Sequence, residues 1–165
     1  MKRFLVAALV MLICAGTVFA LDPAEGYWLS VDSITGKVES GWEIYESEGH
    51  LLGRMLSALG TTAASRATRC RESYPDFPVA GNVKQLPVLG TPWIFGLRME
   101  SPGRWSNGNV IDPSNGSIYR CSLIYHPADG GRFQYETLEI RGQLLFFSGS
   151  QYWRRATREE AAALR

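Results

Sequence analysis

The feature that most constrains the fold of this chain is a hairpin pattern between Arg104 and Arg120. A short strand-like run, Trp105 to Ile111, leads into a turn from Asp112 to Gly116, and a second strand begins at Ser117. Proline fixes its own φ and an Asn-Gly pair supplies positive-φ positions, so the Asp-Pro-Ser-Asn-Gly sequence favours a tight turn. Most of the chain after Ala20 repeats this order of strand, turn and strand, which predicts an all-β fold.

Eight strands can be counted from the turn residues that separate them. The clearest is Thr137–Phe146, in which Leu138, Ile140, Leu144 and Phe146 alternate with polar residues, the period expected of a half-buried strand. Eight sequential antiparallel strands close naturally into an up-and-down barrel, and a two-sheet sandwich is the alternative. The other predicted strands are Gly26–Val31, Lys37–Glu46, His50–Leu59, a segment within Leu86–Met99 centred on Trp93, the two hairpin strands and Gln151–Ala156.

One segment, from Gly60 to Gln85, lacks alternation and predicts a long loop, with one helical turn near Ala63 to Thr68. Long loops in compact domains are often lids or binding loops, and mobile surface segments are as common. Arg66, Arg69 and Arg71 either hold an anionic head group or form part of a solvated surface. Sequence alone leaves both interpretations open.

The C-terminal residues predict a short helix that begins after Thr157. Thr157 can accept a hydrogen bond from the amide of Glu160, and the carboxylate of Glu160 can reach back, which is a capping box. A helix this short is stable only if it packs on the sheet.

The first 20 residues predict a secretory signal. Lys2 and Arg3 precede an apolar run from Phe4 to Val18, and a small residue at Ala20 suits cleavage there. The mature chain, residues 21–165, is then one exported domain, periplasmic or envelope-associated, without a membrane-spanning segment. A lipoprotein processed at Cys14 and an uncleaved anchor are the alternatives.

Composition argues against several function classes. The chain has 17 Lys+Arg against 16 Asp+Glu, so no nucleic-acid-binding surface is expected. The two histidines, His50 and His126, stand in no ligand-spaced cluster, so we expect no metal and no cofactor. Alternation places Glu43 on a polar outer face, and no nucleophile–base pair is apparent, so we expect no enzyme.

Two cysteines, Cys70 and Cys121, remain after the predicted signal. An even count in an oxidising compartment suggests a disulfide, which would close a loop of roughly 50 residues and stabilise the fold by about 4 kcal/mol. Two free thiols, with Cys121 acting as a small core residue, are the alternative.

The two ends of the mature chain resemble the lipocalin signature. Gly26 and Trp28 lie on the first strand, and Trp153 and Arg154 lie on the last. In the lipocalin fold an Arg of the closing strand packs over the first-strand Trp at the barrel floor. The resemblance therefore implies that Gly26, Trp28, Trp153 and Arg154 close one end of the barrel, with a cation–π contact worth about 1 kcal/mol.

A fuller resemblance is to the domain-of-unknown-function 2147 family, small exported bacterial proteins with a lipocalin-like barrel. The family has no established activity to carry over. Two segments depart from its pattern: Arg66–Arg71, where acidic and Asn residues are expected, and Ser148–Ser150, where Gly-Arg-Thr is expected. The matching residues are Gly26–Trp28, Thr35–Lys37, Glu43–Tyr45, Leu52–Arg54, Leu89–Gly90, Gly96–Leu97, Trp105, Gly108, Ile111–Pro113, Gly116, Tyr119, Arg141–Gly142 and Gln151–Arg154.

The sequence thus predicts an eight-stranded lipocalin-like barrel, with a short C-terminal helix, that binds a small apolar or amphipathic ligand. The rival interpretation is a non-catalytic envelope structural or protein-interaction module whose barrel is solid. Cavity volume separates the two. The candidate ligand-binding residues share an apolar strand face or an aromatic ring, and they are Trp42, Ile44, Trp93, Trp105, Tyr119, Leu123, Leu138, Ile140 and Phe146.

Overall fold

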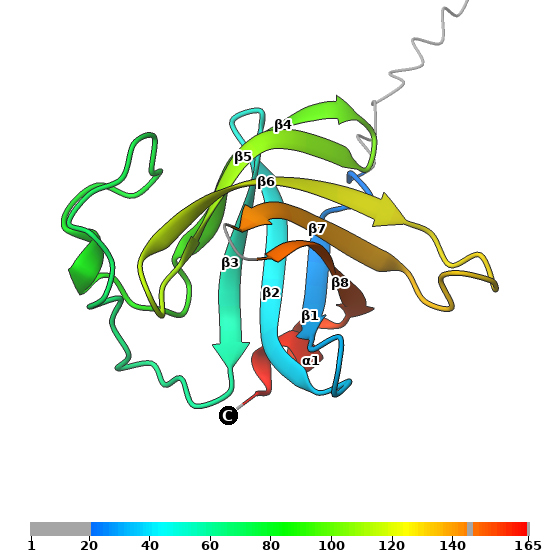
Figure 1. Ribbon diagram of the computed structural model, residues 1–165, viewed down its shortest axis with the longest axis horizontal. Helices are drawn as coiled ribbons and strands as arrows, with labels where there is room; N and C mark the ends of the chain where they lie inside the picture. Colours follow the sequence, from blue (N-terminus) through cyan, green and yellow to red (C-terminus); the bar gives the residue numbers. More distant parts are fainter. Residues whose placement is uncertain (1–20, 145–146, 165) are drawn as a thin grey trace, which may run out of the picture.

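A computed structural model describes residues 21–144 and 147–164, and these form a closed eight-stranded barrel (Figure 1). Each strand pairs antiparallel with the next in sequence, and β8 returns to pair with β1, so the predicted up-and-down barrel is confirmed. The predicted signal, Cys14 and Phe146 lie outside the described residues. The strands are β1 (Gly26–Val31), β2 (Val38–Ser47), β3 (His50–Ala58), β4 (Pro92–Ser101), β5 (Arg104–Asp112), β6 (Ser117–His126), β7 (Thr137–Leu144) and β8 (Phe147–Ala156).

The predicted hairpin is formed by β5 and β6. The amide of Gly116 donates to the carbonyl of Asp112 at 2.8 Å, and Gly116 adopts the positive φ of 75° that the turn requires. Asn115 does not share that conformation, contrary to the prediction. Its side chain instead accepts a hydrogen bond from the amide of Ser117 at 2.8 Å, which starts β6.

Two local predictions were wrong, the start of the last strand and the position of the short helix in the long loop. β8 begins at Phe147, so Ser148–Ser150 belong to the strand rather than to a turn before it. Backbone pairing with β7, in which Gly142 faces Gly149 and Arg141 faces Ser150, overrides the turn preference of Ser and Gly. The short helix of the long loop is the 3-10 helix η1 (Val83–Gln85), and the segment from Ala63 to Thr68 forms non-helical turns instead of the predicted helical turn.

The C-terminal helix α1 (Arg158–Ala162) has the predicted capping box between Thr157 and Glu160. It packs on the outside of the barrel, against β1, β2 and β3 (Figure 1). The hydroxyl of Ser57 donates to the carbonyl of Ala161 at 2.7 Å. A Cβ at Gly41 would lie only 1.8 Å from that carbonyl oxygen, so glycine there permits the close approach. Among the described residues, no helix is long and apolar enough to cross a membrane.

The long connection between β3 and β4, green in Figure 1, packs on the outer face of the barrel. Phe77 of this segment stacks on Trp93, with ring centroids 5.9 Å apart, and meets Phe95 edge-on at 5.3 Å. The hydroxyl of Tyr74 donates to the carbonyl of Gly116 at 2.7 Å. These contacts fix the loop against β4 and the β5–β6 turn.

Candidate functional site

One end of the barrel is closed by side chains and by the segment before β1. The indole N–H of Trp28 donates to the carbonyl of Ala24 at 3.0 Å, and that of Trp105 donates to the carboxylate of Asp22, also at 3.0 Å. Buried side chains occupy the interior of this closed half, and they include Trp28, Ile44, Leu51, Leu97, Trp105, Leu123 and Leu138.

The arginine that completes this closure is Arg155, not the predicted Arg154. The Arg155 guanidinium lies 4.0 Å from the centre of the Trp28 ring. It also donates to the carbonyls of Glu25 and Pro23, each at 2.6 Å, and to Glu136 at 3.0 Å. Successive strand residues face opposite sides of a sheet, so Arg155 shares the inner face with Trp153, and Arg154 is exposed outside.

The other half of the barrel contains an apolar cavity of about 220 Å³. Trp42 and Trp153 form one wall, with their rings stacked 5.0 Å apart. Gly142 and Gly149, opposite each other on β7 and β8, leave space where side chains would otherwise stand, and a Cβ at Gly149 would have no neighbour within 4 Å. The remaining lining residues are Met55, Ile94, Val110, Ile111, Asp112, Pro113, Tyr119, Ile140 and Gln151.

The structure therefore divides the predicted ligand-binding residues into groups. Trp42, Tyr119 and Ile140 line the cavity. Trp93 lies outside the barrel beneath Phe77, because its neighbour Ile94 takes the inner face. Four more fill the closed half instead of lining a cavity, namely Ile44, Trp105, Leu123 and Leu138.

A second pocket of about 380 Å³, lined by both polar and apolar residues and called the vestibule below, adjoins the cavity. The two share Met55, Asp112 and Pro113 in their walls. Arg66 and Arg69 of the long loop line the vestibule. Arg71 does not, and its guanidinium lies over the ring of Tyr74 at 5.8 Å. Two of the three arginines singled out in the sequence are thus brought beside the barrel cavity.

Cys70 and Cys121 are buried and free, so the predicted disulfide is wrong. Cys70 packs against the β5–β6 turn, where a Cβ at Gly116 would lie 2.8 Å from its Cα. Cys121 lies further along β6, about 16 Å from that turn at a rise of about 3.3 Å per residue, and a disulfide needs Cα atoms within about 7 Å. Burial raises the pKa of both thiols, that of Cys121 to about 12, which disfavours thiolate chemistry.

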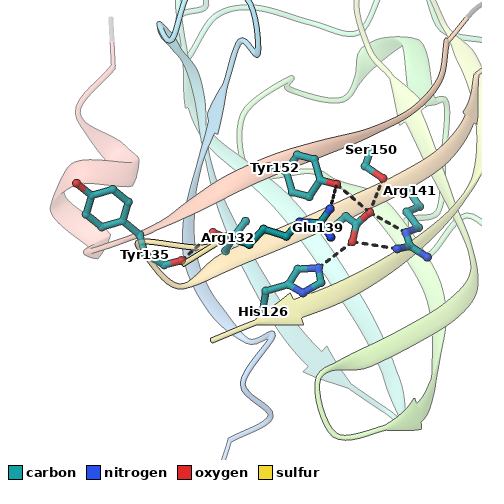
Figure 2. A network of polar contacts seen from close by, with 8 residues as sticks. His126, Arg132, Tyr135, Glu139, Arg141, Ser150 and Tyr152 are labelled. Carbon is teal, nitrogen blue, oxygen red and sulfur yellow. Dashed lines mark hydrogen bonds and ion pairs between the residues drawn. The ribbon is translucent and has the colours of Figure 1, made fainter. Parts of the chain in front are cut away.

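A buried carboxylate on the outer face of the barrel was not identified from the sequence. Glu139 of β7 has only 3% of its side chain exposed, and Figure 2 shows the groups that converge on it. His126 Nε2 lies 2.8 Å from its Oε2, and Arg141 Nε donates to Oε1 at 2.8 Å. The hydroxyls of Ser150 and Tyr152 donate to Oε1 as well. Phe133 of the β6–β7 connection stacks on His126, with the ring centroids 4.3 Å apart.

This network links three strands, β6, β7 and β8. Burial raises the pKa of Glu139, but hydrogen bonds from Arg141, Ser150 and His126 outweigh it and lower the pKa from 4.5 to about 2. A carboxylate with so low a pKa is a weak general base. The Ser150 hydroxyl donates to Glu139 and not to His126, so the arrangement differs from a nucleophile–base pair.

Other surfaces offer less to a ligand. A larger depression, about 990 Å³, lies outside the barrel and includes Tyr45, Arg98 and Arg120 in an open lining of mixed charge. Ligand pockets are usually concave and mostly apolar, which fits the barrel cavity better. Within residues 21–144 and 147–164, no group of three or more His, Cys, Asp or Glu side chains is arranged to hold a metal ion.

Comparison with known proteins supports this architecture. A family model described as "Uncharacterized protein conserved in bacteria (DUF2147)" matches residues 26–155. Among solved structures, protein HP1028 from Helicobacter pylori, described as belonging to the lipocalin family, superposes with a TM-score of 0.61 at 14% identity, covering 83% of this chain and 85% of that chain. At that identity the similarity shows the fold alone. No curated protein matches this chain.

Proposed function

We propose that this chain, which belongs to the DUF2147 family of uncharacterised bacterial proteins, binds the apolar part of a small ligand in the open half of its lipocalin-like barrel. The observation that carries the proposal is the cavity of about 220 Å³ between Trp42, Trp153 and the paired glycines. An apolar cavity of roughly 150 Å³ can hold a benzene ring, so the available space suits a small ring or one end of an alkyl chain.

The binding energy would come from removing apolar surface from water. Ligand sites for drug-sized molecules are larger, roughly 300–1,000 Å³, so only part of a ligand fits this cavity. We expect a Kd of about 10–100 μM, which corresponds to about −7 to −5.5 kcal/mol. Gln151 supplies polar atoms at the cavity wall that can orient the bound group.

The test is titration with a neutral apolar dye, N-phenyl-1-naphthylamine, while the tryptophan emission is recorded. Trp42 and Trp153 line the cavity, so bound dye should quench them saturably. Gly149→Leu adds a side chain into open space and should weaken binding by about tenfold or more, as steric exclusion removes most of the apolar burial. Ile140→Trp should act in the same direction.

Gly131→Leu is the matched control, because Gly131 lies in an exposed loop and its backbone accepts a side chain. It should leave the titration unchanged. Absence of saturable quenching in the unmodified protein would contradict ligand binding. The second candidate, a structural or protein-interaction module, would then be preferred, and the buried side chains that occupy the closed half of the barrel favour it.

We also infer that the chain is exported to the periplasm or envelope. Lys2, Arg3 and the apolar run from Phe4 to Val18 support this inference. Mass spectrometry of the protein purified from its natural source should find Leu21 at the N-terminus. A lipid-modified Cys14 at the N-terminus, or a retained leader, would contradict it.

A further inference from the structure

We propose that Arg66 and Arg69 make the barrel cavity selective for amphipathic anions, with the apolar tail inside the barrel and the anionic head in the vestibule. The inference rests on the proposed binding function and names the class of ligand. It joins two features that are far apart in the sequence, the aromatic wall of the cavity and the arginines of the long loop.

The first argument is continuity between the two spaces. Met55, Asp112 and Pro113 belong to the walls of both the cavity and the vestibule. A ligand whose tail passes Met55 therefore has its other end among the vestibule residues. The vestibule wall places Thr61 and Thr68 beside the two arginines, so this part of the wall suits a charged or hydrogen-bonding head group.

The second argument is that the backbone carrying the arginines is held in place. The amide of Ala67 donates to the carbonyl of Leu86 at 3.0 Å, and the amide of Val88 donates to that of Ser65 at 3.0 Å. On the other side, the carbonyl of Arg69 packs so closely on Gly116 that a Cβ there would lie 2.4 Å from its oxygen. A fixed backbone lowers the entropy cost of binding through its side chains.

The third argument concerns which polar atoms of the vestibule wall already have hydrogen-bond partners. The two acidic residues in the same wall are Glu39 of β2 and Asp112. Asp112 accepts hydrogen bonds from the amide of Ser114 and from Asn115 Nδ2, each at 2.8 Å, so the turn already uses its carboxylate. Arg66 donates through Nη1 to the carbonyls of Ala63 and Ser65.

Those contacts leave the arginines free to bind an anion. The remaining donors of the Arg66 guanidinium stay available, because arginine has five. Arg69 has no side-chain hydrogen bond or ion pair within the described residues. Paired guanidinium donors match the geometry of a carboxylate or a phosphate.

The test compares three ligands that share an eight-carbon tail: octanoate, 1-octanol and octylammonium. Isothermal titration calorimetry at low salt should give the order octanoate, octanol, octylammonium, from tightest to weakest. Two exposed ion pairs are expected to favour octanoate over octanol by about three- to tenfold. That preference should shrink in about 0.5 M NaCl, because the charges are screened.

The decisive variant is Arg66→Gln with Arg69→Gln, which should remove the preference for octanoate while leaving the affinity for octanol unchanged. Arg71→Gln removes the same charge from the same loop outside the vestibule, and it should preserve the preference. Repeating the comparison with octyl phosphate shows whether the vestibule binds a carboxylate or a phosphate head group more tightly. A preference for either anion over octanol supports the proposal if the Arg66→Gln, Arg69→Gln variant loses it.

Three results would overturn the inference. Equal affinity for octanoate and octanol would reject anion selectivity while ligand binding stands. If Arg71→Gln lost the preference for octanoate to the same extent, the preference would come from the overall positive charge of the loop and not from Arg66 and Arg69. Failure of all three ligands to bind would reject the proposed function together with this refinement.

Discussion

Replacing Arg155 with alanine is expected to lower the free energy of unfolding by about 3–4 kcal/mol, the largest effect we predict for one side chain. The guanidinium lies over Trp28 and donates to two backbone carbonyls as well as to Glu136. Its removal would leave the carbonyls of Pro23 and Glu25 without this partner and would open the closed end of the barrel.

Arg154→Ala is the matched control, since Arg154 carries the same charge on the opposite, exposed face of β8. It should change the stability by less than about 0.5 kcal/mol. Urea denaturation of the two variants beside the unmodified protein measures the difference. Arg155→Lys should lower the stability by an intermediate amount, because lysine keeps the charge but lacks the planar guanidinium that donates to two carbonyls at once. Equal effects at the two positions would reject this account of the closure.

Glu139→Gln is expected to cost about 2–3 kcal/mol at pH 7, and the cost should vanish in acid. Burial alone would raise the pKa of Glu139, but Arg141, Ser150 and His126 lower it from 4.5 to about 2. A lowered pKa means that the ionised carboxylate stabilises the folded protein. That contribution is complete above the unfolded pKa of about 4.5 and is lost as the pH falls towards 2.

Urea denaturation at pH 7, 4 and 2.5 tests this expectation. The difference in stability between the unmodified protein and Glu139→Gln should be largest at pH 7 and smallest at pH 2.5. Glu72→Gln, at an exposed position in the long loop, is the control and should differ little from the unmodified protein at any of these pH values. A constant difference across the range would mean that shape, not charge, makes Glu139 important.

The local chemistry of the chain determined its strands and turns. The Asp-Pro-Ser-Asn-Gly turn, the alternation in β7 and the capping box at Thr157 each specify a local conformation by interactions between near neighbours. These interactions involve residues a few positions apart, so they can be read without a fold. The order of eight short strands then left a barrel as the natural closed arrangement, which the structure confirms.

Only the tertiary structure decided which neighbouring residue takes each role. Arg154 and Arg155 are adjacent and chemically identical, and the pairing of β8 with β1 alone places Arg155 against Trp28. Trp93 and Ile94 are both apolar, and the covering loop lets the tryptophan be buried on the outside. Glu139 reads as a solvated strand residue in the sequence, because His126 and Ser150 reach it only when β6 and β8 pair with β7.

The same distinction applies to the candidate site. Trp42 and Ile140 could be assigned to an inner face from alternation, but the cavity between them depends on Gly142 and Gly149 facing each other across β7 and β8. The separation of Cys70 from Cys121 and the approach of Arg66 and Arg69 to the barrel depend on how the long loop folds back. Contacts between residues far apart in the sequence are set by the packing of the whole chain, so they cannot be predicted from the local sequence around each residue.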